Sequence, residues 1–498
     1  MLPAQLRPGW SAGAANVQTE KREEKTMEWL AKINDTVNGV VWGIPMLVLL
    51  VGAGVILSVM TGFIQFRKFG YAMRNTLGKI FKGNTAGKGE VTPFQAVTTA
   101  LAATVGTGNV SGVIAAVTLG GPGSIFWLWI TALIGMCTKF SEVVLAIRYR
   151  ERNKDGDWVG GPMYYIKNGL GKGWGWLAIL FCIFGALAAF GIGNAVQVNN
   201  ITDAVNTAIT AFKPGFAGAT TVNWIIGVVI AVIIGVTLIG GIKRLGSVTE
   251  KLVPFMSVIY IVSCLIVIFG NIGSIGKVFG SIFQYAFTPN AVIGGAAGAA
   301  IKTCITWGVK RGVFSNEAGL GSAPIAHAAS SETNPVKQGL YGIFEVFMDS
   351  IVICSLTGLT ILSAFYSGSV SWTYGVKGGN AIISDAFGTI LGNKLGAVII
   401  ATAISLFALS TILSWALYGS RCCEYLFKTT KCIKPYYVLF IIITLVGCQM
   451  GSGLAWDIAD TLNGLMAIPN LIALIGLSGV VVKLTKEHFS SKDTLKDK

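Results

Sequence analysis

Long apolar runs follow one another at nearly even spacing from Val40 to Leu484. A helix that crosses a bilayer needs about 20 mostly apolar residues, and runs of that length leave no stretch free for a water-soluble domain. Only 12% of the 498 residues are charged and 53% are hydrophobic, whereas a soluble domain contains about 25% charged residues. The sequence therefore predicts an all-α integral membrane protein in contact with a lipid bilayer. It excludes a disordered, a collagen-like or a secreted disulfide-rich chain.

We expect eleven transmembrane helices. The fourth is too long for a simple span, so we expect it to be tilted or to extend into water. The expected ranges are 40–63, 93–118, 123–147, 174–212, 222–241, 252–270, 290–309, 338–366, 395–420, 435–451 and 458–482.

Lysine and arginine test this count, because they gather in the cytoplasmic loops of membrane proteins. In this sequence they are concentrated in alternate connections and in the C-terminal tail. We therefore expect a multi-pass protein of the plasma (inner) membrane, with its N-terminus outside and its C-terminus in the cytoplasm. The same rule accounts for the net charge of +15, so that charge does not indicate a nucleic-acid partner.

Glycine placement singles out two of the expected spans. Gly106–Asn109 interrupts the second span, where each glycine costs a helix up to about 1 kcal/mol. Backbone that leaves the helix at membrane depth must line a cavity or be buried in protein. The seventh span has a second weak point at Gly294–Gly298, after Pro289. There the spacing of the two outer glycines fits close helix packing equally well.

Spans two and seven are five spans apart, so spans two to six and seven to eleven form two blocks of opposite topology. Inverted repeats that each open with a broken helix are typical of secondary transporters of the leucine-transporter type. We expect such repeats at 93–270 and 290–482, preceded by an additional helix at 40–63. Residues 1–39 are expected to form an extracytoplasmic tail, of which 1–26 is dispensable. Residues 483–498 are expected to form a cytoplasmic tail.

The sequence contains no motif for enzymatic chemistry, because HExxH, GxSxG and Walker patterns are all absent. The nine cysteines form no CxxC pair and the chain has two histidines, which does not favour a transition-metal site. A channel would need charged rings or a repeated filter. We therefore expect a carrier that is not an enzyme and holds no cofactor.

Two long strings, Gly120–Trp129 with Gly135 following and Gly312–His327, resemble the sodium:alanine (alanine or glycine:cation) symporter family. The resemblance covers nearly all of the chain from Met27 to Leu484. It implies a leucine-transporter-like fold that carries a small neutral amino acid, alanine or glycine, together with sodium as the coupling ion. The alternative is a proton-coupled or other small-solute carrier, because the same fold serves many cargoes.

The resemblance also implies roles for the interrupted second span. The amides of Thr107 and Gly108 would face the substrate carboxylate, and the carbonyls of Ala102 and Val105 would face sodium. Asn109 would offer a side-chain oxygen near the substrate or the ion. Sodium, like other hard cations, takes oxygen ligands.

The ninth span can complete a sodium site. Ser410 and Thr411 follow Phe407 by three and four residues, so both hydroxyls lie near its turn on one helix face. Together with the carbonyls of Ala102, Val105 and Phe407, these two hydroxyls would give sodium five oxygen ligands. The alternative is that both hydroxyls only bond back to the preceding turn of their own helix. Trp415 shares the face of Thr411, and the family resemblance implies that both line the substrate pocket. The indole would exclude larger substrates, unless it is an ordinary packed aromatic ring.

Three further residues complete the expected substrate site. Ala297 and Ile301 in the seventh span resemble an apolar wall for the substrate methyl group. Gln197, in the fourth span, would reach the pocket if that helix is tilted. Otherwise the helix has reached the outer water at Asn199–Asn200.

Charged residues inside spans are functional candidates by default. Lys139 and Glu142 lie late in the third span, from which they can extend to the cytoplasmic surface. Asp349, in the eighth span, is the best candidate for a coupling or proton-sensitive carboxylate, but a pair with Arg311 or Lys310 at an inner gate is the favoured interpretation.

The connection from Lys310 to His327 is rich in small residues. We expect it to enter the cytoplasm as an inner gate or a re-entrant segment. His327 is then expected to be a surface histidine.

Overall fold

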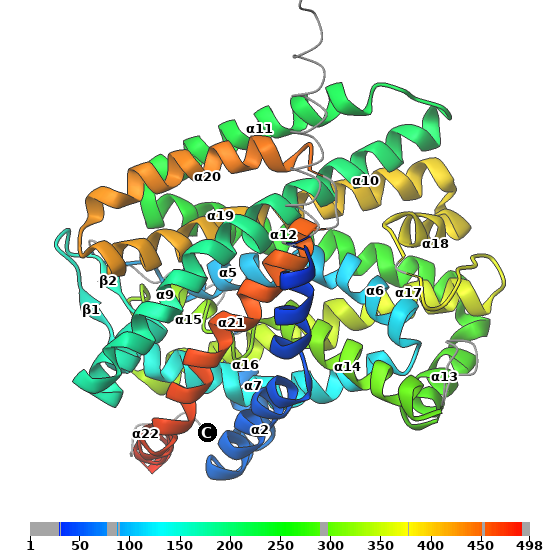
Figure 1. Cartoon of the computed structure of the whole chain (residues 1–498). Coiled ribbons are helices and arrows are strands. Elements are labelled where there is room, and N and C mark those ends of the chain that lie inside the picture. The colour runs from blue at the N-terminus through cyan, green and yellow to red at the C-terminus, as the bar shows by residue number, and fades with distance from the viewer. Residues whose placement is uncertain are drawn as a thin grey trace, which may run out of the picture.

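A computed structural model describes residues 29, 31–76, 87, 90–288, 297–376, 378–450 and 454–490. Figure 1 shows a bundle of helices with one short hairpin, in which β1 (Glu151–Arg152) pairs antiparallel with β2 (Trp158–Val159). The longer helices of the first half are α2 (Ile44–Met60), α4 (Phe69–Thr76), α5 (Pro93–Thr104), α6 (Ser111–Gly120), α7 (Ser124–Tyr149), α9 (Gly175–Phe190), α10 (Val196–Phe212), α11 (Ala219–Ile239) and α12 (Gly241–Gly270). Those of the second half are α13 (Ile275–Phe287), α14 (Ala297–Asn316), α16 (Pro335–Val346), α17 (Ser355–Tyr366), α18 (Ala381–Leu391), α19 (Asn393–Phe427), α20 (Ile433–Gly447), α21 (Leu454–Gly476) and α22 (Ser478–Ser490). Short helical turns complete the described part: α3 (Ile64–Arg67), η2 (Thr107–Asn109), α8 (Pro162–Tyr165), η3 (Ile166–Leu170), η4 (Lys172–Trp174), η5 (Gly191–Ala195), η6 (Ile272–Ser274), α15 (Ala323–His327), η8 (Phe347–Cys354) and η9 (Thr430–Cys432).

Within the described residues, nine helices are long and apolar enough to cross a membrane. The α5 and α6 pair, bent by 54°, is long and apolar enough when taken together, and it brings the number to ten if it counts as one span. These ten correspond to ten of the eleven expected spans. The remaining one, 290–309, corresponds to α14, and its first residues lie outside the described part of the chain. The multi-pass architecture is thus confirmed, while the count of eleven stays a prediction.

The expected break in the second span is confirmed. The helix α5 begins at a capping box in which Thr92 and Gln95 each accept the other's backbone N–H, so both donors at the helix start are satisfied. It ends before Val105, and Gly106 is extended. A single turn, η2, then leads into α6. Gly106–Asn109 therefore does interrupt the span, as the glycine placement indicates.

The expected weak point at Gly294–Gly298 lies largely outside the described residues and stays a prediction, but a second break occurs further along the chain. Gly298 is inside the continuous helix α14, and 294–296 lie outside the described residues. The chain leaves the helix only after Asn316 and resumes as α15. In this break Gly319 and Gly321 have φ values of +92° and +83°, a region that glycine enters at little steric cost.

Other glycines of α14 serve close packing. A Cβ at Gly308 would lie 2.5 Å from the Ser124 carbonyl oxygen, so this glycine lets α14 approach α7. The stretch from Lys310 to His327 is largely buried in the bundle. Its expected role as an inner gate or a re-entrant segment on the cytoplasmic side stays a prediction.

Two long spans contain wider, π-type turns. The helix Lys172–Phe212 has 41 residues and includes η5 between α9 and α10. The eighth span includes η8 between α16 and α17. Such turns often occur at functional sites. The residues Gln197 and Asp349 lie just after the first and inside the second.

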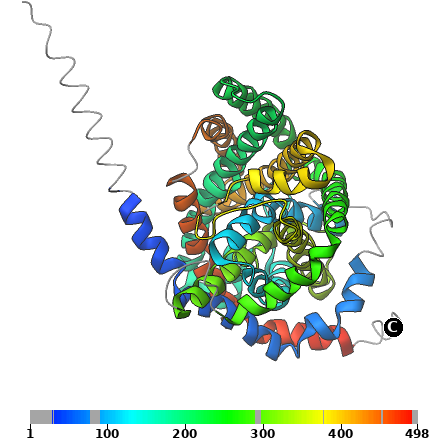
Figure 2. The same ribbon diagram turned by 90° about the vertical axis from the view of Figure 1, so that its right-hand side faces the viewer.

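Connections expected on one side of the membrane contact one another. Val91 forms a bridge with Ser330, and Arg152 lies 2.6 Å from Glu90. Figure 2 shows the C-terminal helix α22 beside the segment that follows α2, where Tyr71 and Phe489 meet with ring centroids 5.7 Å apart. The connections that meet here are the ones in which lysine and arginine are concentrated.

The opposite set of connections also meets. The Gly375 N–H donates to the Thr118 carbonyl at 2.8 Å. The Ser274 hydroxyl donates to the Ser363 carbonyl at 2.9 Å. The contacts therefore sort the connections into the two groups that the charge pattern indicates.

Candidate functional site

The two helix breaks meet in the interior of the bundle. A Cβ at Gly108 would lie 3.1 Å from the ring of Phe314, near the end of α14. Asn109 donates from its side-chain nitrogen to Asp349 Oδ1 at 2.6 Å. Ser315 donates to the other oxygen of that carboxylate at 2.9 Å. Residues that were distant in sequence thus form one buried polar centre.

Oxygens of α5 and α19 form a compact cluster beside the first break. The Thr411 hydroxyl lies 3.0 Å from both the Ala102 and the Phe407 carbonyl oxygens. The Ser410 hydroxyl lies 3.1 Å and 2.8 Å from the same two oxygens. Both hydroxyls therefore bond back to their own helix and also reach across to α5. Four of the five oxygens expected for sodium are brought together.

Backbone geometry around the cluster depends on glycine. A Cβ at Gly106 would overlap the Thr411 hydroxyl, so only glycine permits this approach of the break to α19. Val105, the residue after α5, is buried, and its N–H bonds to the Leu101 carbonyl. Its N–H therefore still belongs to the hydrogen-bond ladder of α5, directly before the break.

Gln197 reaches the first break. Its side-chain oxygen accepts from the Thr107 hydroxyl at 3.0 Å and from the Thr107 N–H at 3.4 Å. Its side-chain nitrogen donates to the Ile192 carbonyl at 2.9 Å inside η5. The Asn109 side-chain oxygen accepts from the Gly106 N–H at 2.8 Å. Gln197 is 3% exposed, so it lies in the interior and not in outer water.

Trp415 links the ninth span to the second break. Its indole packs so closely on Gly193 that a Cβ there would overlap the ring. The indole N–H donates to Glu317 Oε1 at 3.0 Å. Ser322 donates to the other oxygen of Glu317. The carboxylate thus receives a donor on each oxygen, which buried carboxylates require.

Asp349 has no basic partner among the described residues. Its carboxylate receives the donors of Asn109, Ser315 and Ser350, the last at 2.8 Å. Lys310 instead pairs with Asp460 at 2.6 Å. The structure therefore contradicts the inner-gate pair as an interpretation of Asp349.

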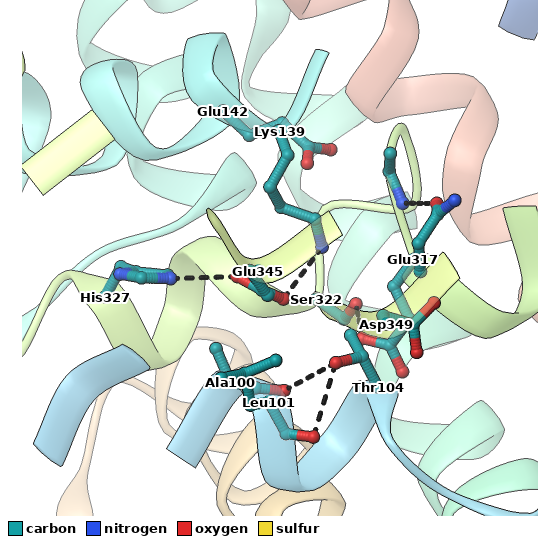
Figure 3. A network of polar contacts seen from close by, with 12 residues as sticks. Ala100, Leu101, Thr104, Lys139, Glu142, Glu317, Ser322, His327, Glu345 and Asp349 are labelled. Carbon is teal, nitrogen blue, oxygen red and sulfur yellow. Dashed lines mark hydrogen bonds and ion pairs between the residues drawn. The ribbon is translucent and has the colours of Figure 1, made fainter. Parts of the chain in front are cut away.

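A buried ionic cluster lies next to this centre. Figure 3 shows Lys139 and His327 approaching Glu345 from different directions. The distances are 3.4 Å from Lys139 Nζ and 3.1 Å from His327 Nε2, and all three side chains are 0% exposed. His327 is also bonded to Gln338 at 2.9 Å through Nδ1. The expectations of a surface-reaching Lys139 and a surface histidine are both wrong, because these groups find partners inside the protein.

Glu142 holds the second break. Its Oε1 accepts the N–H groups of Gly319 and Gly321, each at 3.1 Å, and the side-chain N–H of Asn470 at 2.6 Å. A break in a helix frees backbone donors that must be satisfied internally at membrane depth. Glu142 supplies that acceptor, so it does not extend to the surface.

Along α14, Phe314 lies against Gly108 of the first break and Trp307 against Gly120 at the end of α6. Ile301 therefore stands further from the break than either. It lies one turn before Cys304, whose thiol donates to the Tyr285 carbonyl of α13. The side chain of Ala297 lies outside the described residues. The apolar ring beside Gly108 is instead that of Phe314. Sequence reasoning missed Phe314, Ser315 and Glu317, although all three stand in the string Gly312–His327 that carries the family resemblance.

Comparisons with known proteins agree with that resemblance. A model of the sodium:alanine symporter family matches residues 27–498. The sodium/alanine symporter AgcS of Methanococcus maripaludis is 44% identical over 470 residues, which cover 92% of this chain and 97% of the relative. The probable sodium/glutamine symporter GlnT of Bacillus subtilis is 35% identical, with coverage of 92% and 91%.

A solved structure shows a similar fold. The crystal structure of MhsT in complex with L-phenylalanine matches with a TM-score of 0.55 and 13% identity, over 81% of this chain and 99% of that chain. At this identity the likeness concerns the fold alone. It supports the leucine-transporter-like architecture and leaves the repeat arrangement as a prediction.

Proposed function

Because the chain belongs to the sodium:alanine symporter family, we propose that it imports small neutral amino acids, alanine or glycine, coupled to sodium by alternating access. One observation carries this proposal. Two helices break close to each other in the interior, and the freed backbone of the first lies against hydroxyls of α19 and the side-chain amide of Gln197 in α10. Broken helices of this kind bind carboxylates through their amides and cations through their carbonyls.

The proposed sodium site consists of five oxygens. They are the carbonyls of Ala102, Val105 and Phe407 and the hydroxyls of Ser410 and Thr411. The two hydroxyls lie 2.8 to 3.1 Å from the carbonyl oxygens of Ala102 and Phe407, which supports one small site. An all-oxygen set of this kind suits a hard cation. On binding, sodium would take over the carbonyls that the two hydroxyls now engage.

The proposed substrate site adjoins it. The amides of Thr107 and Gly108 would bind the substrate carboxylate, in the place where the Thr107 N–H now meets Gln197. Asn109 and Gln197 would add polar contacts, and Thr411 would lie between substrate and ion. Trp415 would close the pocket around the side chain, together with Phe314, which contacts Gly108.

Asp349 supports a second candidate, proton coupling. Its carboxylate is 0% exposed, and its described partners are uncharged. A buried carboxylate of this kind changes charge when it binds a proton or a cation. A proton-driven carrier of the same fold would use Asp349 in place of the hydroxyl and carbonyl cluster.

We further propose the topology that the basic residues indicate. The helix α5 would enter from the cytoplasmic side and α14 from the outer side, so that the two broken helices open inverted repeats at 93–270 and about 290–482. The N-terminal tail would then lie outside and the C-terminal tail in the cytoplasm of a plasma membrane. The contacts between like-sided connections support this arrangement.

Sodium dependence of uptake tests the coupling ion. Thr411→Val and Ser410→Ala should each raise the sodium concentration for half-maximal alanine uptake into proteoliposomes, while Ser405→Ala, on a partly buried turn of the same helix, should not. Uptake that persists when choline replaces sodium, and that follows a pH gradient and is lost in Asp349→Asn, would favour proton coupling instead.

A further inference from the structure

A cavity of about 510 Å³ opens where the β1–β2 hairpin meets the start of α9 and the end of α19. None of the residues proposed for sodium or the substrate is among its described lining residues. Its walls belong to connections that we propose to lie in the cytoplasm. Ligand pockets in proteins commonly have volumes of about 300–1,000 Å³, so the cavity has room for a small molecule or a lipid headgroup.

The two carboxylates in the cavity wall already have partners. Glu151 accepts from Lys167 Nζ at 2.9 Å. Glu424 accepts from Arg421 at 2.5 Å and from the Asn153 side-chain nitrogen at 2.8 Å. Their negative charge is therefore balanced by groups of the protein, and neither carboxylate calls for a further cation.

Two lysines of the wall are left without a carboxylate. Lys154, in the hairpin turn, and Lys428, directly after α19, are exposed. Neither forms an ion pair with another residue in the described part of the chain. The remaining basic residue of the wall, Arg152, pairs with Glu90 at 2.6 Å. The cavity thus presents an excess of positive charge, which complements an anion.

Another part of the wall is apolar and continues as a stripe along α9. Ile179 lines the cavity and is 47% exposed. Trp176, Ile183 and Leu187 are also exposed, and their spacing of three and four residues places all four side chains on one helix face. On a spanning helix such a face lies against the hydrocarbon core of the bilayer. The stripe therefore leads from the basic residues into the lipid acyl chains.

Two tryptophans indicate the level of the cavity in the membrane. Trp174 and Trp176, at the start of α9, are exposed, and their ring centroids lie 6.4 Å apart. Tryptophan is enriched where a membrane meets water, at the level of the lipid headgroups. The cavity is thus placed where a phospholipid changes from charged headgroup to acyl chain.

We propose that this cavity binds an anionic phospholipid, whose phosphate pairs with Lys154 and Lys428 and whose acyl chain follows the exposed stripe of α9. Basic pockets beside spanning helices recognise headgroups of this kind. A zwitterionic headgroup would bring an ammonium group toward the two free lysines, so the site should prefer a lipid of net negative charge. The proposal adds a lipid site and does not depend on which solute the central site carries.

Native mass spectrometry tests the proposal on the purified full-length protein, titrated in a neutral detergent with dioleoylphosphatidylglycerol or dioleoylphosphatidylcholine. The parent should bind one phosphatidylglycerol more tightly than any phosphatidylcholine. Lys154→Gln and Lys428→Gln should each weaken this binding about fivefold, and the double variant about 30-fold, the factors expected for one and two lysines near an anionic lipid. Lys243→Gln is the matched control, because Lys243 is an exposed lysine of another basic connection that does not line the cavity.

The acyl chain is tested separately from the headgroup. Ile179→Ser should weaken phosphatidylglycerol binding, whereas Ile225→Ser, on an exposed isoleucine of α11, should not. The deacylated headgroup glycerophosphoglycerol and inorganic phosphate should both fail to displace the lipid at equal concentrations. Displacement by either would assign the cavity to a soluble phosphate compound and overturn the lipid site.

The charge preference decides the central point. Equal binding of the two lipids by the parent, or a preference for phosphatidylglycerol that survives in the double variant, would overturn the proposal. Because both lysines and Ile179 are exposed, the variants should keep the fold, which sodium-dependent alanine uptake by each variant checks. Absence of that uptake in the parent would contradict the proposed function and leave the lipid site standing.

Discussion

The indole N–H of Trp415 in α19 donates a 3.0 Å hydrogen bond to the carboxylate of Glu317, in the break between α14 and α15. Both side chains are nearly fully buried. The contact fixes the orientation of the ring against Gly193 and ties the ninth span to the second break. A movement of this break during transport would therefore be transmitted to the residue that we place over the substrate.

Two substitutions of Glu317 should show how much its role as a hydrogen-bond acceptor contributes to the free energy of unfolding. Glu317→Ala leaves the Trp415 N–H and the Ser322 hydroxyl without an acceptor, and each such loss costs about 1–3 kcal/mol. Glu317→Gln keeps one acceptor oxygen, so its free energy of unfolding in mixed micelles should fall less. If both variants lose the same stability, the hydrogen bond to Trp415 does not organise the break.

Size selection should depend on Trp415. The indole leaves room for alanine or glycine, and overpacking by a larger side chain costs about 1–3 kcal/mol, or about 5- to 150-fold in affinity. Trp415→Ala should therefore admit leucine and methionine as competitors of alanine uptake and weaken alanine itself. Trp176→Ala, an exposed tryptophan, is the control. Equal competition by leucine in parent and variant would show that Trp415 does not cap the pocket.

The ion pair of Lys139 and Glu345 should be costly to break from one side. Lys139→Met leaves the buried carboxylate with only His327 beside it, and loss of one member of a buried pair typically costs about 3–5 kcal/mol. Adding Glu345→Gln removes the unpaired charge and should recover part of the loss. Lys302→Met, on an exposed lysine, should change the free energy of unfolding by less than about 0.5 kcal/mol. A single variant as stable as the parent would contradict this account of the cluster.

Cysteine labelling checks the proposed orientation. Lys277 in α13 and Lys431 in η9 are exposed and stand in connections of opposite groups. In a Cys432→Ser background, Lys277→Cys should react with a membrane-impermeant maleimide added outside cells, and Lys431→Cys should react only after permeabilisation. The reverse labelling pattern would invert the topology.

The first half of the site was predictable from sequence because local composition carries it. Glycines around Thr107 interrupt an otherwise apolar run, and a break at membrane depth has few structural solutions. The spacing of Ser410 and Thr411 after Phe407 fixes both hydroxyls on one face. The structure joins these two signals through the Ala102 carbonyl.

The break after Asn316 was not predicted from the sequence. The two charged residues next to it each find a buried partner from a distant span, because Lys310 pairs with Asp460 and Glu317 accepts from Trp415. The string Asn316–Ser322 repeats the combination of two closely spaced glycines with Asn and a hydroxyl that marks the first break. That signal was readable. The partners that satisfy the buried groups, such as Glu142, which accepts from the Gly319 N–H, come from distant spans and could not be identified from the local sequence.

The most direct test of the central claim is counterflow of labelled alanine in proteoliposomes that contain the purified full-length protein, with and without an inward sodium gradient. Alanine should accumulate only when sodium is present, choline should not replace sodium, and Thr411→Val should shift accumulation to higher sodium concentrations. Accumulation of equal size without sodium would contradict the proposed sodium coupling.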